Sequence, residues 1–276
     1  MTSHDGPPGF DISVPHPARR YDYWLGGKDN FAPDRASGDA IAAIFPGIRV
    51  AARENRRVLA RMVRHLVTDC GIRQFLDIGT GLPTAGNTHE VAQSIDPTCR
   101  IVYVDNDPIV LAHARALLTS HPAGRTNYLD ADLRNAQQIV GSDAVADTFD
   151  LTQPVAVLLI AVLHFIASDD EARSIVQQLV EPLAPGSYLA MSHATADLLD
   201  PEIVAKFAAA KAPGDDITGR SYQQVAELLD DLDIQPPGIQ VVSRWRPDPG
   251  TDPPPDDQVS MYGALARVAD RAAARR

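Results

Sequence analysis

Cysteine is scarce in this sequence, and it contains no long apolar run. Only two cysteines occur among the 276 residues, Cys70 and Cys99, and neither stands in a CxxC pair or in a cluster with metal-ligand spacing. No stretch approaches the roughly 18 apolar residues that cross a bilayer, and the N-terminal residues show no charged region followed by an apolar run. We therefore expect a cytoplasmic protein that uses no metal and is neither exported nor inserted in a membrane.

Positive charge is also in short supply. The chain has 25 lysine and arginine residues against 36 aspartate and glutamate residues, a formal net charge of −11. A surface of that sign repels phosphate backbones and anionic lipid heads, so we expect no nucleic-acid partner. The basic residues nevertheless gather in the first quarter of the chain, between Arg19 and Arg64, which leaves a local anionic partner open there.

Several nucleotide-binding and nucleophile motifs are missing. The chain has neither the G-x-x-x-x-G-K-[ST] sequence of phosphate-cradling loops nor the G-x-S-x-G sequence of a serine nucleophile. The G-x-G-x-x-G pattern of nicotinamide-binding turns, begun at Gly79, would need glycine or alanine where Thr84 stands. These absences argue against an ATP-hydrolysing enzyme, and they weaken the case for a nicotinamide-dependent oxidoreductase without removing it.

Short apolar runs alternate with helical patterns from residue 74 onward. This alternation predicts βαβ units, and runs that are apolar on both faces are typical of a parallel sheet covered by helices on both sides. The stretch 247–257 is too rich in proline for regular structure and is expected to be an exposed loop between two strands that pair. The expected strands are 74–78, 100–104, 126–129, 154–162, 187–191, 239–245 and 259–268, and the expected helices are 50–70, 90–95, 108–119, 169–183, 201–211 and 222–232.

The chain divides into three parts on this evidence. Residues 1–17 are rich in proline, glycine and polar groups and are expected to form a disordered arm. Residues 18–71 form an N-terminal helical segment, and 72–276 form a Rossmann-like domain. No internal repeat or interdomain linker is evident.

Acidic residues follow three of the expected strands in order. The segment Asp77-Ile-Gly79-Thr-Gly81 ends the first strand in a turn whose glycines let a ligand approach the backbone. Asp105 ends the second strand, where a carboxylate can bind both hydroxyls of a ribose, and Asp132 follows the third, where it can accept a hydrogen bond from the adenine amine. Each signal is weak alone; the three together indicate an adenosine-containing ligand, and carboxylates suit a cationic sulfonium.

Two other acidic positions have simpler explanations. Asp107, followed by proline, is better explained as a helix cap than as a ligand contact. Asn87 and Glu90 have the spacing of a capping box, which satisfies free N–H groups at a helix start.

Four segments together resemble one protein family. They are 15–31 (PHPARRYDYWLGGKDNF), 75–84 (FLDIGTGLPT), 104–108 (VDNDP) and 161–165 (AVLHF). They are similar to a group of bacterial S-adenosylmethionine-dependent methyltransferases, formerly a domain of unknown function, over nearly the whole chain. Pro83 replaces the third glycine usual in class I methyltransferases, but this family shares it.

The resemblance implies an α/β fold of the Rossmann-like class I methyltransferase type. This fold has a mostly parallel seven-stranded sheet with helices on both faces and an antiparallel C-terminal strand, here with an N-terminal helical lid. The implied cofactor is S-adenosyl-L-methionine. The residues expected to contact it are Tyr21, Asp77, Gly79, Thr80, Gly81, Leu82, Asp105, Asn106, Asp132, Leu133 and Ala161.

The N-terminal run from Arg19 to Phe31 mixes aromatic rings, cations and a glycine pair, a composition suited to folding over a ligand. A lid over the cofactor is one interpretation; an N-terminal subdomain packed on the core through its aromatic rings is the other. His164 is the best-placed candidate for a general base, although a structural role fits as well and many methyl transfers need no base. The residues expected to contact the acceptor are Tyr23, Trp24, Lys28, Asn30 and Phe165.

The sequence thus favours a methyltransferase that acts on a small-molecule acceptor. The alternative is a non-catalytic protein that binds S-adenosylmethionine and acts as a regulator. The fold fixes the cofactor side of such a protein while variable loops choose the substrate, so neither the acceptor nor the oligomeric state follows from the sequence.

Overall fold

Eight strands form one mixed sheet in the computed structural model, which describes residues 11–117, 119–210 and 217–269. Their order across the sheet is β3-β2-β1-β4-β5-β8-β6, and β7 also pairs with β8. The strands are β1 (Gln74–Ile78), β2 (Arg100–Asp105), β3 (Arg125–Asp130), β4 (Ala156–Ile160), β5 (Tyr188–Ala194), β6 (Asp233–Ile234), β7 (Gln240–Val241) and β8 (Met261–Arg267). The five neighbours from β3 to β5 are parallel, whereas β8 runs antiparallel to β5, β6 and β7.

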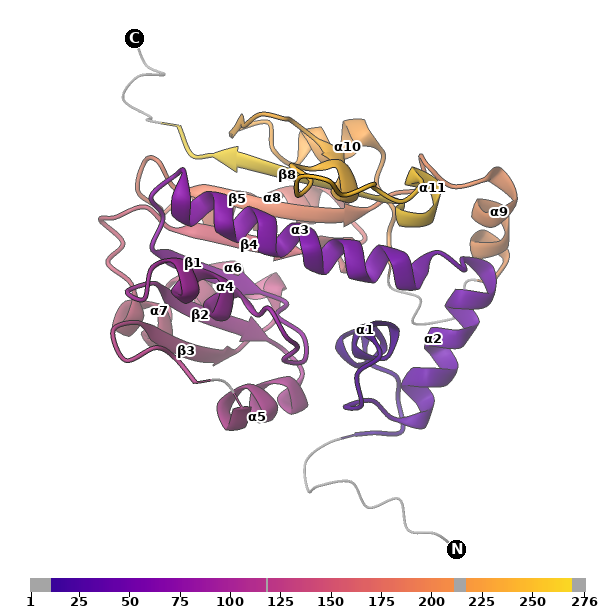
Figure 1. Ribbon diagram of the computed structural model, residues 1–276, viewed down its shortest axis with the longest axis horizontal. Coiled ribbons are helices and arrows are strands. Elements are labelled where there is room, and N and C mark those ends of the chain that lie inside the picture. The colour runs from indigo at the N-terminus through magenta and orange to yellow at the C-terminus, as the bar shows by residue number, and fades with distance from the viewer. Residues whose placement is uncertain (1–10, 118, 211–216, 270–276) are drawn as a thin grey trace, which may run out of the picture.

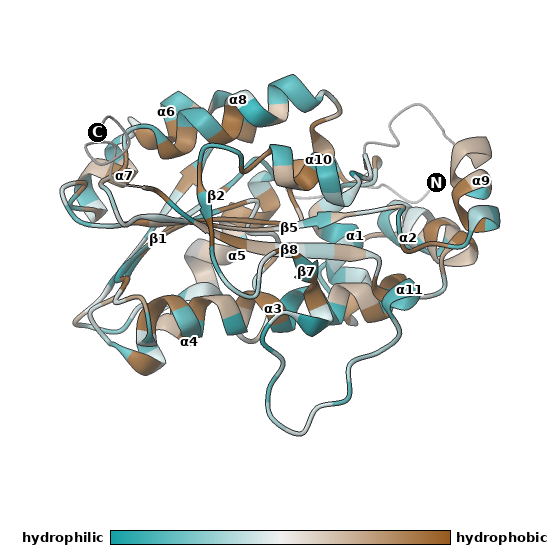
Figure 2. Cartoon of the chain, turned by 90° about the horizontal axis from the view of Figure 1, so that it is seen from above, coloured by the Kyte–Doolittle hydropathy of each residue, from teal (hydrophilic) through white to brown (hydrophobic). Residues whose placement is uncertain are grey.

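Helices cover both faces of the sheet. Figure 2 shows α3 and α4 on one face and α6 and α8 on the other. The α-helices are α1 (Pro17–Leu25), α2 (Ala32–Ile44), α3 (Ile48–Thr68), α4 (Thr88–Ile95), α5 (Pro108–Leu117), α6 (Ala136–Val140), α7 (Asp143–Thr148), α8 (Asp169–Val180), α9 (Pro201–Ala210), α10 (Tyr222–Glu227) and α11 (Asp256–Val259). Three 3-10 turns join them, η1 (Leu133–Asn135), η2 (Leu163–Phe165) and η3 (Val242–Arg244). None of the helices in the described ranges is long and apolar enough to cross a bilayer.

The strands and α3 share one hydrophobic core. Every residue of β1 and β4 is buried, as expected for strands covered on both faces. The long helix α3 presents an apolar stripe that includes Val58, Met62 and Leu66, all fully buried in the same cluster as the strands. Figure 1 shows α3 lying along the sheet and leading back to α1 and α2, which stand together beside it.

The order of the strands places a crevice at one edge of the sheet. The chain moves outward from β1 through β2 to β3, then returns to the other side of β1 with β4 and β5. Ligands of open α/β sheets bind where the direction reverses, outside the carboxyl ends of the strands. Here that point lies between β1 and β4.

The predicted alternation and the parallel sheet are confirmed, with differences toward the C-terminus. The sheet has eight strands rather than seven, because β6 and β7 are two-residue strands that both pair with β8. The expected strand 239–245 is wrong beyond Val241, where the chain turns into η3. Arg61 of α3 explains the turn, because it donates hydrogen bonds to the carbonyls of Val242 (2.6 Å) and Trp245 (2.9 Å) and so takes two carbonyls away from strand pairing.

Other expected boundaries also shift. The strand expected at 154–162 covers only 156–160, and the helix expected at 222–232 ends at Glu227. The first ten residues of the expected arm lie outside the described residues, as do residue 118 of one expected helix and residue 211 of another. The region between residues 17 and 47, where apolar residues follow no clear helical or strand spacing, contains two helices, α1 and α2.

Candidate active site

The turn after β1 contains two glycines with left-handed backbones, at φ 74° for Gly79 and 68° for Gly81. A Cβ atom on Gly79 would lie 2.5 Å from a methyl carbon of Val162, so this glycine lets the β4 loop pack against the turn. A Cβ atom on Gly81 would meet nothing within 4 Å. Gly81 therefore presents bare backbone toward open space at the crevice.

Asp105 lies beside this turn at the end of β2. Its two carboxylate oxygens accept hydrogen bonds from the backbone amides of Gly81 (2.8 Å) and Asp107 (2.9 Å). Burial raises the pKa of Asp105 above its ordinary value. The strand end thus holds a carboxylate in a fixed orientation next to the glycine turn.

Asp132 continues the same edge at the end of β3. It accepts hydrogen bonds from the amide of Arg134 (2.8 Å) and from the side chain of Asn106 (3.1 Å). Leu133, which follows it, is buried. The structure therefore connects the predicted site residues Gly81, Asp105, Asn106 and Asp132 along the carboxyl ends of β1, β2 and β3.

Asp77, inside β1, is directed toward α4. It is buried and accepts a hydrogen bond from the hydroxyl of Thr88 at 2.6 Å. Burial raises the pKa of Asp77 to about 6. The predicted capping box at the start of α4 is confirmed, because the Glu90 carboxylate accepts a hydrogen bond from the Asn87 amide at 3.0 Å.

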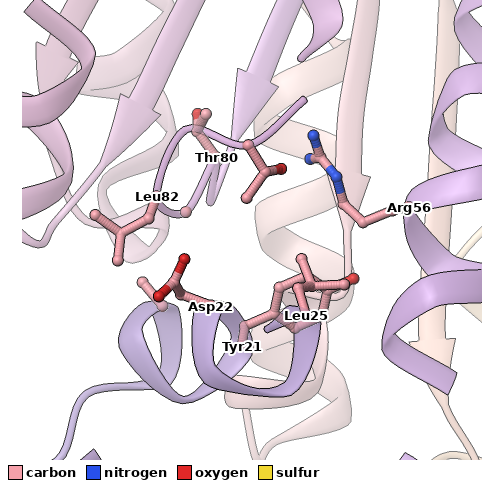
Figure 3. A pocket seen from close by; sticks show the side chains of 9 residues that line it. Tyr21, Asp22, Leu25, Arg56, Thr80 and Leu82 are labelled. Atoms are coloured by element: carbon pink, nitrogen blue, oxygen red, sulfur yellow. The ribbon is translucent and has the colours of Figure 1, made fainter. Parts of the chain in front are cut away.

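Helix α1 lies across the glycine turn and leaves a small pocket there, with a cavity volume of about 20 Å³ (Figure 3). The Tyr21 hydroxyl anchors one wall by donating to the carbonyl of Ala52 and accepting from the amide of Asn55, both at 2.9 Å. The pocket is lined by Ala18, Tyr21, Asp22 and Leu25 of α1, Arg56 of α3, and Thr80, Gly81, Leu82 and Thr84 of the turn. Tyr21, Thr80, Gly81 and Leu82, four of the predicted cofactor contacts, therefore meet at one place.

Arg56 is a pocket residue to which the sequence assigned no role. Figure 3 shows its side chain reaching from α3 toward the glycine turn. Its terminal nitrogen Nη2 is buried and has no hydrogen-bond partner among the residues that the structure describes. The cluster of basic residues in the first quarter of the chain was the only signal in the sequence.

The residues expected to contact an acceptor from the N-terminal segment lie elsewhere, and none of them lines the pocket. Trp24 is buried and donates to the carbonyl of Gly38 in α2. The Tyr23 hydroxyl donates to Asp39 of the same helix, and Lys28 is exposed.

Asn30 is held inside the N-terminal segment itself. It is buried and donates to the carboxylate of Asp22 (2.8 Å) and the carbonyl of Gly27 (3.0 Å). It thus braces the loop between α1 and α2 rather than facing the pocket.

His164 and Phe165 follow β4 in η2, with ring centroids 4.4 Å apart. His164 is buried, and its Nδ1 has no hydrogen-bond partner in the described part of the chain. Burial, assisted by the neighbouring His193, Arg20 and Arg220, lowers the pKa of His164 well below its ordinary value. The ring is therefore neutral at pH 7.

The backbone before His164 is held in a strained form. Ala161 has a left-handed backbone, φ 55°, a conformation that residues other than glycine rarely adopt. Its amide donates to the Ser192 hydroxyl at 2.9 Å, and that hydroxyl in turn donates to Asn55 of α3. Strain of this kind persists where the surroundings fix it, and it concentrates at functional sites.

A buried Arg220 supports the loop after β4 from behind. It donates to the carboxylate of Asp169 (2.7 Å) and to the carbonyls of Leu163 (3.2 Å) and Ile166 (2.8 Å). The position of His164 is therefore determined by a hydrogen-bonded framework and not by loop packing alone.

A cluster of charges joins α1 to the start of α5. The carboxylate of Asp107 lies 3.1 Å from His16 and 3.5 Å from Arg19, and Arg19 also lies 3.6 Å from Asp34. The second oxygen of Asp107 accepts from the amide of Ile109 at 2.9 Å, which confirms the predicted cap. This cluster, the Asp107 latch, fixes α1 beside the strand end that carries Asp105.

The comparisons with known proteins agree on one family. A model of the S-adenosyl methyltransferase family matches residues 3–269. A DUF574 family protein of Streptomyces avermitilis is 44% identical, with a TM-score of 0.85 over 93% of this chain and 98% of its own. A protein of Thermobifida fusca, described as a proposed methyltransferase, is 38% identical, with a TM-score of 0.87 over 97% of this chain and 100% of its own.

More distant structures share the fold. The magnesium protoporphyrin IX methyltransferase of Synechocystis, solved with bound S-adenosylhomocysteine, is 15% identical, with a TM-score of 0.54 over 91% of this chain and 93% of its own. The class I methyltransferase fold is therefore confirmed. Among curated proteins no match to this chain is found.

Proposed function

The chain belongs to the S-adenosyl methyltransferase family and is an S-adenosylmethionine-dependent methyltransferase, and on this premise we propose that it methylates a small molecule held beside the carboxyl end of β4. The observation that carries the proposal is the enclosure of the glycine turn by α1, which leaves a cavity of only about 20 Å³ over the turn. While α1 covers the turn, a segment of folded protein or a nucleic-acid duplex cannot enter so confined a space. Neither the family nor the similar structures support the alternative of a non-catalytic regulator.

The residues at the edge of the sheet fit the proposed cofactor. The ribose needs an acceptor for its two hydroxyls, and Asp105 places a carboxylate beside the bare backbone of Gly81. The adenine amine needs an acceptor farther along the edge, where Asp132 is partly exposed. The cationic sulfonium suits a pocket bordered by a carboxylate, that of Asp22 on α1.

Bound S-adenosylmethionine supplies an electrophilic methyl group on its sulfonium. The protein's task is then orientation and exclusion of water, because an in-line displacement gains most from a fixed approach of the two reacting atoms. We assign the cofactor side to the glycine turn, Asp105 and Asp132. The acceptor side falls to the strained Ala161 backbone and to Phe165, which Arg220 and Ser192 hold in place.

His164 sets a condition on the acceptor. A neutral imidazole can accept a hydrogen bond or a proton, but a ring with so low a pKa is a weak base near pH 7. We therefore propose an acceptor atom that can attack the methyl group without first losing a proton, with His164 orienting it through a hydrogen bond. An alkyl hydroxyl, which needs a strong base, does not fit this role.

The N-terminal segment acts in this proposal as a lid. Ligand pockets usually enclose 300–1,000 Å³, whereas α1 leaves a cavity of only about 20 Å³ above the turn. Helix α1 must therefore move outward for the cofactor to enter and return to cover it. Tyr23 and Trp24 join α1 to α2 in this proposal, through the hydrogen bonds of the Tyr23 hydroxyl with Asp39 and of the Trp24 ring with the carbonyl of Gly38.

Transfer of labelled methyl groups tests the proposal. The protein is incubated with methyl-labelled S-adenosylmethionine and a cell extract separated into molecules below and above about 1 kDa, and the products are identified by mass spectrometry. We expect label in the small-molecule fraction with the wild type and a strong reduction with Asp105→Ala. Label found only in the large-molecule fraction, or in none despite tight cofactor binding, would contradict the proposal.

A further inference from the structure

Arg56 is a cation in the lid pocket that the site described so far does not use. It lies in the middle of α3, and its side chain approaches the glycine turn from the side opposite Leu82 (Figure 3). Its terminal nitrogen is buried without a hydrogen-bond partner among the described residues. An unpaired buried donor on a charged group is costly, so its retention indicates that a ligand completes it.

The carboxylates nearest to this pocket do not satisfy Arg56. Asp22, which lines the opposite wall, already accepts hydrogen bonds from the side chain of Asn30 (2.8 Å) and the amide of Asp29 (3.0 Å). Asp77 is engaged with Thr88. Within the described ranges, Arg56 forms no ion pair. The guanidinium is therefore available to an anion that enters the pocket from outside the chain.

The cofactor itself offers one such anion. S-adenosylmethionine carries no phosphate, and its only negatively charged group is the α-carboxylate of the methionine part. The adenosine assigned to Asp105 and Asp132 would lie over β2 and β3, so the methionine part would extend across β1 toward β4. Helix α3 packs on that side of the sheet, and Arg56 enters the pocket from it.

We propose that Arg56 binds the α-carboxylate of S-adenosylmethionine and so selects ligands with an intact amino-acid end. The inference rests on the adenosine placement at Asp105 proposed above. A guanidinium forms charge-assisted, often bidentate hydrogen bonds with a carboxylate, which is the geometry that a lysine cannot reproduce. Since the product S-adenosylhomocysteine keeps the carboxylate, Arg56 binds both forms equally and contributes to affinity rather than to the rate of the chemical step.

Binding calorimetry on the full chain separates this role from a structural one. The ligands are S-adenosylmethionine and decarboxylated S-adenosylmethionine, which differ only in the carboxylate. The variants are Arg56→Gln, Arg56→Lys and, as a matched control on the exposed face of the same helix, Arg53→Gln.

We expect Arg56→Gln to weaken S-adenosylmethionine binding about 10- to 100-fold while decarboxylated S-adenosylmethionine binds with the same or higher affinity. Arg56→Lys should recover part of the loss, and Arg53→Gln should bind both ligands as the wild type does. The wild type should prefer the intact cofactor by the same factor that Arg56→Gln loses.

Three results would overturn the proposal. Equal weakening of both ligands in Arg56→Gln would show that Arg56 only supports the fold, and unchanged affinity for both would show that the carboxylate lies elsewhere. A wild type that binds decarboxylated and intact cofactor equally would exclude any carboxylate subsite. If the wild type bound neither ligand, the cofactor assignment itself would fail, which is a separate outcome.

Discussion

At the scale of single residues, Gly79 and Gly81 share a left-handed backbone but have different surroundings. Replacing either by alanine adds the strain of a side chain at positive φ, about 1–2 kcal/mol. At Gly79 the new methyl group must also displace Val162, which adds roughly 1–3 kcal/mol of overpacking. At Gly81 the methyl group enters open space in the free protein but the proposed ligand space in the complex.

We therefore predict that Gly79→Ala mainly lowers stability, whereas Gly81→Ala mainly lowers ligand affinity. Gly79→Ala should lower the free energy of unfolding by about 3 kcal/mol, and Gly81→Ala by about half as much, in urea titrations of the ligand-free protein. Gly81→Ala should nevertheless weaken S-adenosylhomocysteine binding sharply in calorimetry. Normal binding by Gly81→Ala would mean that the cofactor does not lie against this face of the turn.

Asp77 carries a pH-dependent cost. Its pKa in the folded protein is about 6, above the unfolded value near 3.8, so the folded state binds a proton more tightly. Stability from this group is complete at acidic pH and is lost as pH rises from about 4 to 6, at about 1.4 kcal/mol for each pH unit. The charged form at pH 8 thus destabilises the free protein by up to about 3 kcal/mol.

Asp77→Asn should remove this cost while its amide oxygen still accepts the Thr88 hydrogen bond. Relative to the wild type, the variant should gain roughly 2 kcal/mol of unfolding free energy between pH 4.5 and pH 8, measured by urea titration at both values. Cofactor affinity should fall at the same time. A difference between the two proteins that stays constant with pH would show that Asp77 is not destabilised by burial.

The site residues differ in how far the sequence could reveal them. Asp105 and Asp132 were predictable because they end strands, and the ends of parallel strands meet at one edge. Arg56 was not, because its role depends on the path of α3 across the sheet and on α1 covering the pocket. One basic residue among several on a helix carries no local sign of which neighbour faces a cavity.

At the scale of elements, the sequence predicted a helical N-terminal segment, but the bounds of α1 escaped prediction for a physical reason. Its buried positions include Arg19, Arg20 and Asp22, so the face that packs inward is polar and no apolar period marks the helix. Charges replace hydrophobic contacts here, through the Asp107 latch and the Asp22–Asn30 hydrogen bond. An element held by charges is suited to opening, because its contacts exchange for water at lower cost than a hydrophobic core.

Loosening the Asp107 latch should release α1. Asp107→Asn keeps an oxygen for the cap on Ile109 but removes the charge that faces His16 and Arg19. We expect faster hydrogen exchange in residues 17–25 and a loss of about 1–3 kcal/mol in the free energy of closing, seen as weaker cofactor binding.

The matched control is Asp29→Asn. It removes a partly exposed carboxylate that lies 3.5 Å from the ring of His113, where the N-terminal segment also faces α5. A pair of this kind contributes little, so exchange and affinity should change by less than about 0.5 kcal/mol. The Asp107 latch would be ruled out if both variants changed hydrogen exchange and cofactor affinity equally. It would also be ruled out if hydrogen exchange in α1 were unchanged in Asp107→Asn.

Strands were predicted more closely than their connections. The central strands are apolar on both faces, which is typical of strands in a covered parallel sheet and made them easy to predict. In contrast, β7 ends early because Arg61, which is distant in sequence, binds the carbonyls that follow it. A contact between residues about 180 positions apart leaves no trace in local composition. Such contacts decide where weak elements end.

At the scale of the whole molecule, the site is assembled from distant parts of one chain. Residue 21 of α1 and residue 56 of α3 line the pocket over the glycine turn, and Asp105 at the end of β2 binds the amide of Gly81 in that turn. Asp132 follows the next strand along the same edge of the sheet. The acidic composition suits the proposed cofactor, whose sulfonium is positively charged. We propose that the edge of the sheet binds the cofactor and that the loops after β4 select the acceptor.

A crystal structure of the protein with S-adenosylhomocysteine tests the central claim most directly. We expect the ribose hydroxyls on Asp105, the adenine amine near Asp132, the ligand backbone against Gly81, and α1 closed over it with Arg56 at the carboxylate. Density for the ligand at another edge of the sheet, or along this edge with its carboxylate at Asp132 and its adenine under α1, would contradict it.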